Sequence, residues 1–450
     1  MPKVSVIMPC LNMAQYIEEC IKSVVCQTLT DIEILIVDAG STDGTLDILQ
    51  SYKTKDQRIR MVHSHKRSYG HQVNLGISAA AGEYIGIVDT DDRILPDMYE
   101  TLYSVISQSN ADYVKGTGEL FFTLPEKNVY QYSYLPLPYG AYGEDGKIEV
   151  CPHETPYLLP IDNFLWNGIY RNGFLKNIRL HESPGAAFQD LGGLLQTQLN
   201  AHKAVYINKP VYEYRQDNAG ASSYNKNGIH FVENEYLWAE QFLNGQSDGW
   251  HTSFYRKQLG HFVSRFEIMA ALEVPLEDAM PAVLTITERL KSANKQGILT
   301  QKDLTEEQWE NLQLLWKDPY LLYNKFLNNY APGKNFIKDI IENLSVRPGI
   351  IFGSGKMGKF LHAQLLYRGY KTIEAYCDNN KLVQGKYQYG AEIVSPEQAV
   401  ERFPQHKYVI ANKYHASEMK EQLEELGINK KDIIIYSSGM DVRLFGAKLF

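Results

Sequence analysis

Long apolar runs are missing from this chain of 450 residues. A membrane-spanning helix needs roughly 18 or more consecutive apolar residues, and no stretch approaches that length. Near the N-terminus the apolar stretch 4–8 ends at Pro9, which is too short for the core of a secretory signal. We therefore expect a cytoplasmic protein, for which peripheral association with the inner face of a membrane stays open.

Cysteine and excess positive charge are also scarce. The chain has five cysteines, an odd number, and none of them forms a CxxC pair. This pattern is typical of reduced thiols rather than of a disulfide framework or a zinc site. The formal net charge is −8, which argues against a nucleic-acid partner because such proteins tend to be basic. The length and an ordinary content of charged and hydrophobic residues indicate a globular protein of two or three domains.

Strands and helices alternate through the first part of the chain. The pattern predicts strands at 3–8, 32–37, 58–63 and 83–88, and helices over 14–27, from Thr45 onward and over 74–81. This order favours an α/β fold with a mostly parallel sheet flanked by helices. In such sheets ligands bind beyond the carboxyl ends of the strands. Two acidic loops, 38–43 and 89–92, follow two of the predicted strands and are therefore candidate site loops.

Carboxylates are most concentrated in the second of these loops. The run Asp89-Thr90-Asp91-Asp92 places three acids within four residues, directly after a buried strand. Like charges this close repel one another unless a cation or hydrogen bonds offset them. A divalent metal with oxygen ligands is the simplest partner. For this motif taken alone, an acidic turn that caps the next helix is the alternative. For Asp38 and Asp43 in the first loop, the corresponding alternative is an Asx-type turn.

The chain divides into three predicted parts. Residues 1–225 form a first domain, whose later portion is rich in aromatics and prolines, and residues 226–345 are largely helical without a recognisable catalytic motif. Residues 346–450 open with a strand and the run Gly353-Ser354-Gly355-Lys356-Met357-Gly358, and a helix and a second strand ending at Asp378 follow. Glycines in such a turn let a phosphate approach the backbone. This predicts a small Rossmann-like domain.

The motifs of the first domain resemble those of family 2 glycosyltransferases with the GT-A fold. They are 4–9 with Asn12, 37–45, 81–85 leading into 89–92, Trp166, Phe188-Gln189-Asp190, and Tyr214-Arg215 followed by Ser222-Ser223. They occur in the family's order and span roughly half of the chain. Three positions depart from the family pattern, Ala39 in place of a second acid, Leu11 in place of an aromatic and Gln189 in place of a glutamate. The first two leave the donor base open.

The resemblance implies a metal-dependent, inverting sugar transfer. The donor would be a nucleotide-sugar, and the acceptor a hydroxyl of a cell-surface polysaccharide, a teichoic-acid-like polymer or a lipid-linked glycan. Asp91 together with Asp89 would hold Mn²⁺ or Mg²⁺, and Asp190 would take the proton from the acceptor. The donor contacts that the resemblance implies are Pro9, Asp38, Asp43, Asn74, Asp89, Asp92 and Arg215. Trp166 and His181 are candidates for the acceptor side, with core packing as the alternative.

A different function would centre on residues 346–450. In this alternative, the protein would be an NAD-dependent enzyme that modifies a sugar or a sugar nucleotide, and residues 346–450 would bind the NAD. The expected nucleotide contacts are Gly353, Gly355, Gly358 and Asp378. No Tyr-x-x-x-Lys pair for hydride chemistry stands out, so we expect a binding, regulatory or docking module instead. Homo-oligomerisation stays open.

Overall fold

The computed structural model describes residues 1–123, 129–134, 142–218, 220–221, 225, 227–329, 337–412 and 415–436. The chain forms two compact units, one of residues 1–120, 133–215 and 220–324, and the other of residues 121–132, 216–219 and 325–450. The helical stretch up to residue 324 therefore belongs to the first unit. The division into three domains at 225 and 345 stays a prediction. Ser222 and Ser223 lie outside the described residues.

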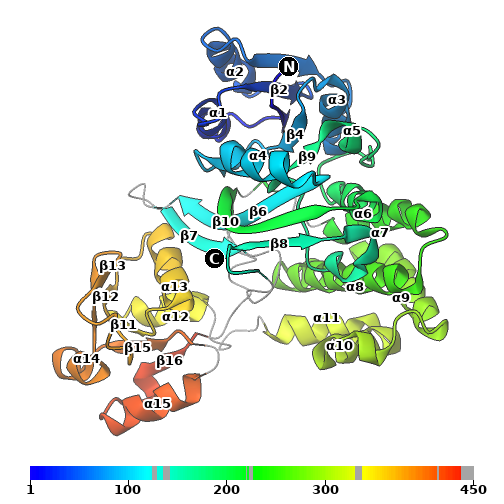
Figure 1. Ribbon diagram of the computed structural model, residues 1–450. Coiled ribbons are helices and arrows are strands. Elements are labelled where there is room, and N and C mark those ends of the chain that lie inside the picture. The colour runs from blue at the N-terminus through cyan, green and yellow to red at the C-terminus, as the bar shows by residue number, and fades with distance from the viewer. Residues whose placement is uncertain are drawn as a thin grey trace. The chain divides into compact units, whose positions relative to one another are not determined.

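The larger sheet has ten strands within the described residues, in the order β3-β2-β1-β4-β9-β6-β10-β5, with β7 beside β6 and β8 beside β10 (Figure 1). Its strands are β1 (Val4–Cys10), β2 (Ile32–Asp38), β3 (Ile59–His63), β4 (Tyr84–Ile87), β5 (Arg93–Ile94), β6 (Tyr113–Thr123), β7 (Val129–Tyr134), β8 (Lys147–Val150), β9 (Gly168–Arg171) and β10 (Ala204–Arg215). Strands β3, β2, β1 and β4 run parallel, whereas β9 pairs with β4 in the antiparallel sense. The predicted α/β class is confirmed.

Helices cover both faces of the parallel strands. They are α1 (Ile17–Val25), α2 (Thr45–Lys53), α3 (Tyr69–Ala79), α4 (Met98–Ser109), α5 (Asn172–Leu175) and α6 (Asp190–Asn200), with short 3-10 turns at Pro152–Glu154 and Pro156–Leu158. Every residue of β1 and β2 is buried, as expected for parallel strands covered on both sides. Side chains of α1 and α4 pack with one face, and those of α3 and α6 pack with the other.

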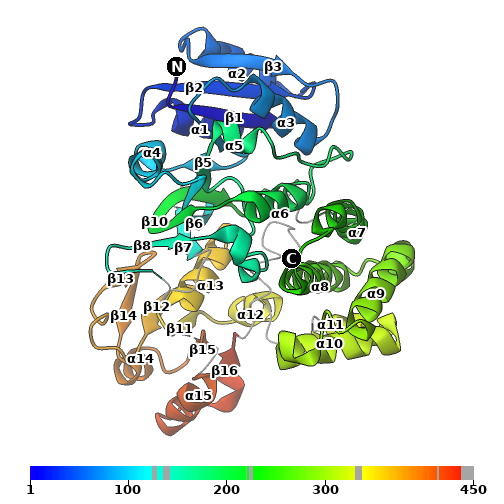
Figure 2. The same ribbon diagram turned by 45° about the vertical axis from the view of Figure 1, so that its right-hand side comes forward.

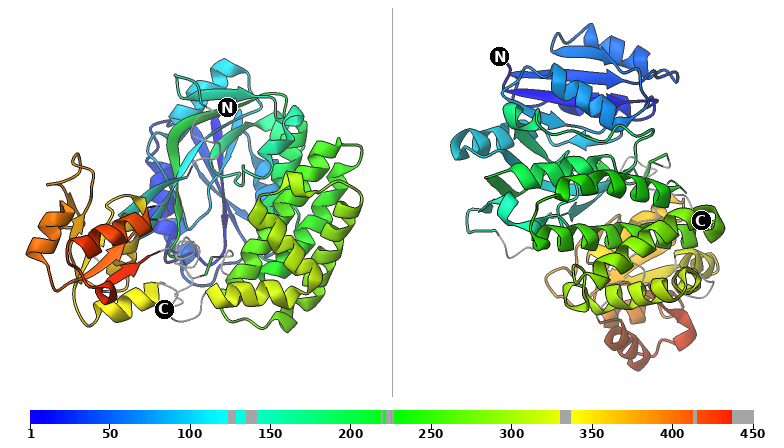
Figure 3. Two further views of the ribbon diagram at one scale, coloured as in Figure 1. Left: turned by 90° about the horizontal axis from the view of Figure 1, so that it is seen from below. Right: turned by 90° about the vertical axis from the view of Figure 1, so that its right-hand side faces the viewer.

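The end of the first unit is helical. It contains α7 (Gly228–Ala239), α8 (Asp248–Ala271), α9 (Met280–Lys295), α10 (Glu306–Lys317) and the first part of α11 (Pro319–Asn329), with 3-10 turns at Glu240–Leu243, Leu276–Ala279 and Gln301–Asp303. Figure 3 shows these helices stacked on one another as green and yellow-green coils. Contacts join α6 to α7 and α7 to both α8 and α9. The helical stretch is therefore packed against α6, the helix that begins with Asp190.

Over its described residues, the second unit has a six-stranded sheet with the order β13-β14-β12-β11-β15-β16 (Figure 2). Its elements are α12 (Ile337–Leu344), β11 (Gly349–Phe352), α13 (Lys356–Tyr367), β12 (Ile373–Cys377), β13 (Tyr387–Gln388), β14 (Ala391–Val394), α14 (Pro396–Arg402), β15 (Lys407–Ile410), α15 (Ala416–Glu425), a 3-10 turn at Lys430–Asp432 and β16 (Ile433–Ile435). All of its pairs are parallel except the edge pair of β13 and β14. Helices α12 and α13 pack on one face, and α14 and α15 on the other.

Among the described residues, no helix has the length and apolar character that crossing a bilayer requires.

Candidate active site

The candidate site lies where β1, β2 and β4 end together. Strand β1 pairs in parallel with both β2 and β4, so their carboxyl ends meet at one edge of the sheet. Gln72 of α3 fixes this edge, because its side-chain amide donates to the carbonyls of Cys10 at 2.8 Å and Val37 at 2.6 Å. Pro9 lies within β1, and its carbonyl accepts a hydrogen bond from the Thr90 hydroxyl at 2.9 Å. The two acidic loops are thus held beside the same strand end.

Asp38 and Asp43 organise the first acidic loop. The Asp38 carboxylate accepts hydrogen bonds from the Gly40 N–H at 2.8 Å and the Ser41 hydroxyl at 2.5 Å. The Asp43 carboxylate accepts from the Thr45 hydroxyl at 2.5 Å and the Ala14 N–H at 3.0 Å. The hydrogen bonds from Thr45 and Ala14 outweigh the opposing effect of burial and lower the pKa of Asp43. Both side chains therefore form the Asx-type turns named as the alternative, and their contact with a donor stays a prediction.

The second acidic loop contains two partly exposed carboxylates and one interior carboxylate. Asp89 and Asp91 are half-buried, whereas Asp92 is 1% exposed. Asp92 accepts hydrogen bonds from the Tyr212 hydroxyl at 2.9 Å and the Arg215 backbone N–H at 2.7 Å. Burial and the charges of Asp91 and Asp89 raise the pKa of Asp92. Asp92 thus anchors the loop to β10, which leaves Asp89 and Asp91 as the carboxylates at the edge of the site.

Residues of β10 and of α1 hold this loop through hydrogen bonds and an ion pair. The Tyr212 hydroxyl accepts the N–H of Asp89 at 3.0 Å while it donates to Asp92. Arg215 donates to the carbonyl of Asp91 at 2.6 Å and forms an ion pair with Glu19. Its guanidinium also lies 4.9 Å from the centre of the Tyr16 ring. Arg215 is buried, so in this structure it holds the acidic loop, and the diphosphate contact that the resemblance implies stays a prediction.

Asp190 begins helix α6, and the residue before it is locked in place. The Gln189 side-chain oxygen accepts the Gly70 N–H at 2.6 Å, and its amide nitrogen donates to the Ser183 hydroxyl at 2.8 Å. A glutamate, which relatives often carry here, could accept but not donate. Gly70 has no room for a side chain, because a Cβ atom would lie 1.9 Å from the His181 carbonyl oxygen. The start of α3 and the segment before Asp190 are therefore tightly joined.

Tyr69 links this segment to the acidic loop. Its hydroxyl donates to Asp89 at 3.0 Å, and its backbone N–H donates to the Gly185 carbonyl at 2.9 Å. Burial and the charges of Asp89 and Asp190 raise the pKa of Tyr69, so the hydroxyl keeps its proton and lies close to both acids. The structure thus brings the two carboxylate elements of the prediction together around one tyrosine.

The pKa values of these acids are set by burial and by neighbouring charges. Burial raises the pKa of Asp190 to about 6, although the positive charges of Lys257 and Lys115 oppose the shift. Burial, followed by the charge of Asp91, raises the pKa of Asp89 to about 7. At neutral pH Asp190 is mostly ionised. A cation at Asp89 would favour its ionised form, because opposite charges nearby lower a carboxyl pKa.

The donor set at the end of β4 fits a hard divalent cation. Asp89 and Asp91 offer carboxylate oxygens, and their mutual repulsion is what a cation would relieve. Among the described residues, however, one group of three metal-binding side chains has its ligand atoms within 4.8 Å of one another, and it lies elsewhere. A cation at Asp89 and Asp91 would thus rely on one or two carboxylates plus substrate oxygens and water, as Mg²⁺ commonly does.

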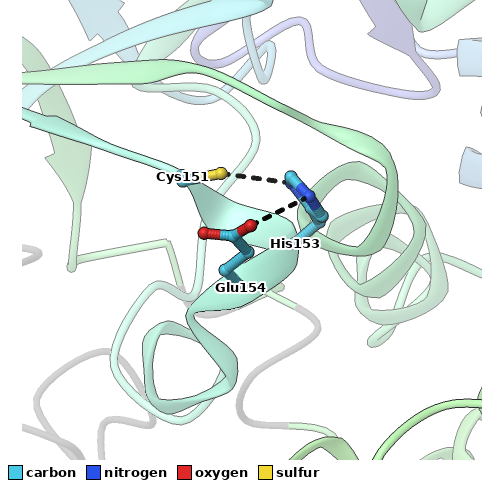
Figure 4. Close-up of side chains that lie close together, drawn as sticks. All are labelled: Cys151, His153 and Glu154. Atoms are coloured by element: carbon cyan, nitrogen blue, oxygen red, sulfur yellow. Dashed lines mark hydrogen bonds and ion pairs between the residues drawn. The ribbon is translucent and has the colours of Figure 1, made fainter.

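That separate group consists of Cys151, His153 and Glu154, at and after the end of β8 (Figure 4). The Cys151 sulfur lies 3.3 Å from His153 Nδ1, which is also 3.1 Å from the Ala201 carbonyl. His153 Nε2 lies 3.8 Å from a Glu154 side chain that is 73% exposed. Because Nδ1 donates a hydrogen bond to the Ala201 carbonyl, it is not available as a metal ligand. We therefore assign this group no part in the site.

Other predicted residues have structural contacts. Asn74 is buried, and its amide exchanges hydrogen bonds with the backbone of Leu180 and donates to Glu182, so its donor contact stays a prediction. Trp166 is 5% exposed and stacks on Tyr212 with ring centres 4.1 Å apart, which is the core packing named as its alternative. His181 bonds Glu235 at 3.0 Å and stacks on the Trp238 ring.

The glycine-rich loop of the second unit follows β11. Gly353 has φ +106°, and a Cβ atom on Gly358 would lie 1.9 Å from the Gly353 carbonyl oxygen. Asp378, at the end of β12, accepts hydrogen bonds from the N–H and hydroxyl of Ser354, each at 2.7 Å. Next to the loop is a cavity of about 420 Å³, which Gly353, Asp378, Asn412 and residues of α15 line. A Cβ atom on Gly355 would meet open space.

Sequence reasoning missed two contributors to the site. Tyr69 fell in a predicted loop before the helix at 74–81, although Ser68 is a recognisable N-cap whose hydroxyl accepts the His71 N–H at 3.3 Å. Lys257 fell in the stretch without a motif. A polar stripe at positions 257, 261 and 265, spaced four residues apart in a helix, is the signal that could have indicated it.

The fold places two acidic loops at one edge of a parallel sheet, and comparison with known proteins assigns the family. A model described as glycosyl transferase family 2 matches residues 5–161, and one described as C2185-like, N-terminal matches residues 347–434. The glycosyltransferase GlyG of Streptococcus pneumoniae is 30% identical over 228 residues, which cover 47% of this chain and 70% of GlyG. The uncharacterized glycosyltransferase YibD of Escherichia coli is 27% identical over 234 residues, 50% of this chain and 65% of YibD. This chain belongs to glycosyltransferase family 2, and it is an enzyme of that class.

A solved structure supports the fold. The crystal structure of S. aureus TarS 1-349 in complex with UDP-GlcNAc aligns with a TM-score of 0.52 at 19% identity and covers 74% of this chain and 93% of that chain. At this identity the likeness shows a shared fold. It is consistent with the GT-A fold that the sequence motifs predict.

Proposed function

We propose that this glycosyltransferase moves a sugar from a nucleotide-sugar to a hydroxyl of a glycan or lipid-linked acceptor, with inversion at the anomeric carbon and with a divalent cation. The observation that carries the proposal is the contact made by Tyr69 and Gly70, since the Tyr69 hydroxyl donates to Asp89 while the Gly70 N–H donates to Gln189, the residue before Asp190. A cation-binding carboxylate and a second, separately held carboxylate are what such a reaction needs. GlyG is a named glycosyltransferase, and the TarS structure that aligns with this chain is a complex with UDP-GlcNAc; both support the choice.

Asp91 and Asp89 are the residues that would hold Mn²⁺ or Mg²⁺. Bound there, the cation would neutralise the charge that develops on the departing nucleoside diphosphate. The chain prepares this position without the cation, because Tyr69 orients Asp89 and Arg215 holds the backbone of Asp91. Asp92 contributes by fixing the loop to β10.

Asp190 would act as the general base. Its carboxylate would accept the proton of the acceptor hydroxyl as the oxygen attacks the anomeric carbon from the side opposite the leaving group. The pKa of about 6 suits this role, because the carboxylate is ionised at neutral pH yet basic enough to take a proton. The oxocarbenium-like transition state is stabilised by nearby negative charge.

A donor screen tests the proposal. The wild-type chain is incubated with Mn²⁺ and a panel of nucleotide-sugars that starts with UDP-GlcNAc, the ligand in the TarS structure, and the released nucleoside diphosphate is measured. We expect release with one donor class and a loss of at least about a hundredfold in Asp91→Asn. Asp47→Asn, which changes an exposed aspartate of α2, is the matched control and should keep the wild-type rate. Equal rates in wild type and Asp91→Asn would contradict the proposal.

We further propose that the second unit is a Rossmann-like nucleotide-binding module without catalytic chemistry of its own. The cavity of about 420 Å³ beside Gly353 and Asp378 supports this, because ligands of such sheets bind at the carboxyl ends of the strands. Thermal unfolding is measured with NAD, NADH and nucleoside diphosphates. We expect one nucleotide to raise the melting temperature in wild type but not in Gly358→Ala, whose new methyl group would displace the loop. Turnover of NAD(H) would instead favour the oxidoreductase alternative.

A further inference from the structure

Phe188, two residues before Asp190, has a strained backbone. Its φ is +61°, in the left-handed region that residues other than glycine adopt rarely and at an energetic cost. The next residue, Gln189, is held on both sides by hydrogen bonds to α3 and to Ser183. A strained conformation persists only where the surroundings enforce it. The question is therefore which contacts hold Phe188 in place.

Helix α8 supplies those contacts. The His261 ring lies 5.3 Å from the Phe188 ring, and the Arg265 guanidinium lies 5.5 Å from its centre. The Tyr236 hydroxyl of α7 lies 3.2 Å from His261 Nδ1 and orients that ring. Burial and the charges of Lys257 and Arg265 lower the pKa of His261, so the ring packs in its neutral form. Phe188 is thus clamped between two side chains one helical turn apart.

Lys257 lies one turn earlier on the same stripe of α8. It is 3% exposed, and its ammonium donates to the Leu159 carbonyl at 2.7 Å and to Asn163 Oδ1 at 2.6 Å. These partners are uncharged. Burial lowers the pKa of Lys257 to about 8, against the opposing charges of Asp162 and, after it, Asp190. Burial raises the pKa of Asp190, and the charge of Lys257 is the largest of the effects that lower it. The other charged or titratable groups around Asp190 are Lys115, Asp89, Tyr69, Tyr170, Glu235 and Tyr236.

We propose that α8 is part of the catalytic machinery, in which His261 and Arg265 position the segment 188–190 and Lys257, one turn earlier on the same stripe, contributes a positive charge. The inference rests on the proposed role of Asp190 as the base. It gives a function to a helix that follows the sheet and carries no motif of its own. The three residues are positioning residues, since they act on the reacting atoms through Asp190.

The first test is Phe188→Gly. Glycine adopts a left-handed conformation without strain, so the fold is expected to persist, while the ring that α8 clamps is lost. We expect kcat to fall about tenfold or more because the base is no longer fixed at its working distance, with KM for the donor within about twofold of wild type. Unchanged kcat in a folded Phe188→Gly protein would overturn the positioning role.

The second test is Lys257→Met, read as a pH profile of kcat. Loss of the positive charge should raise the pKa of Asp190, so the acid limb of the profile should move to higher pH. Lys295→Met removes an exposed lysine at the end of α9 and should leave the profile unchanged. An unmoved acid limb in Lys257→Met would overturn the charge role. Asp190→Asn separates this inference from the proposed function, because full activity in that variant would contradict the base itself.

Discussion

Asp190 shows how a single residue acquires a functional pKa from its surroundings. Burial disfavours its charged form, whereas Lys257 and Lys115 favour it, and the result is a pKa of about 6. An exposed aspartate would be a weaker base, and without the lysines the pKa of Asp190 would be higher. The balance between the two influences is what makes the residue suitable for proton abstraction.

The pH dependence of the reaction follows from this value. Only the ionised carboxylate can accept a proton, so kcat should rise with pH through about 6 and then level off. Asp190→Asn removes the basic group while it keeps the shape, and we expect kcat to fall by about 10² to 10⁴. The measurement is kcat from about pH 5 to pH 8 in wild type and variant. A wild-type profile that is flat through pH 6 would exclude Asp190 as the base.

At the level of helices and strands, the apolar runs predicted the four parallel strands of the larger sheet but not its remaining strands. Strands β1 to β4 lie within a residue or two of the predicted ranges. Strands β1, β2 and β4 are buried throughout, whereas β3 is an edge strand with exposed Arg60 and His63. Helix α3 was predicted to begin at 74, but it begins at Tyr69. Its first turns carry Gly70, His71 and Gln72, which are polar or small yet buried, because they bond strand ends and neighbouring backbone. Periodicity of apolar residues cannot reveal a helix face that is buried through hydrogen bonds.

The candidate site could be predicted only in part for a related reason. The order of the motifs indicated Asp89, Asp91 and Asp190 as site residues. The sequence does not show, however, which carboxylates accept hydrogen bonds from within the protein instead of facing a ligand. Asp92 and Asn74 carry the same residue types as site residues, yet both point into the protein. Tyr69 and Lys257 come from segments far from any motif, and only the three-dimensional packing brings them to Asp89 and Asp190.

A buried ion pair makes a testable contribution to the stability of the sheet. Lys115 of β6 and Asp162 are each 1% exposed, and their charged atoms lie 2.7 Å apart. Lys115→Met would leave Asp162 buried without its partner, so we expect the free energy of unfolding to drop by about 3–5 kcal/mol. Urea denaturation is the measurement. Lys209→Met breaks the exposed pair with Asp97 and should cost about 1 kcal/mol or less. Equal losses in the two variants would contradict the account of the buried pair.

On the scale of the whole molecule, the chain combines a sugar-transfer unit with a second α/β unit. The first unit holds the acidic loops, Asp190 and the helix α8 that packs against the base segment, so it contains every group that the proposed reaction uses. The second unit has its own core on both faces of its sheet and its own cavity. We therefore expect the rate of sugar transfer to depend on the first unit, and nucleotide binding in the second to act as a separate property.

The most direct measurement is the initial rate of nucleoside diphosphate release over a series of Mn²⁺ concentrations, in wild type and in Asp91→Asn. The wild-type rate should rise to saturation with Mn²⁺ and disappear in EDTA, whereas the variant should stay at least about a hundredfold slower even at high Mn²⁺. A wild-type rate that is unaffected by EDTA, or a variant that reaches the wild-type rate, would contradict a cation site at the end of β4.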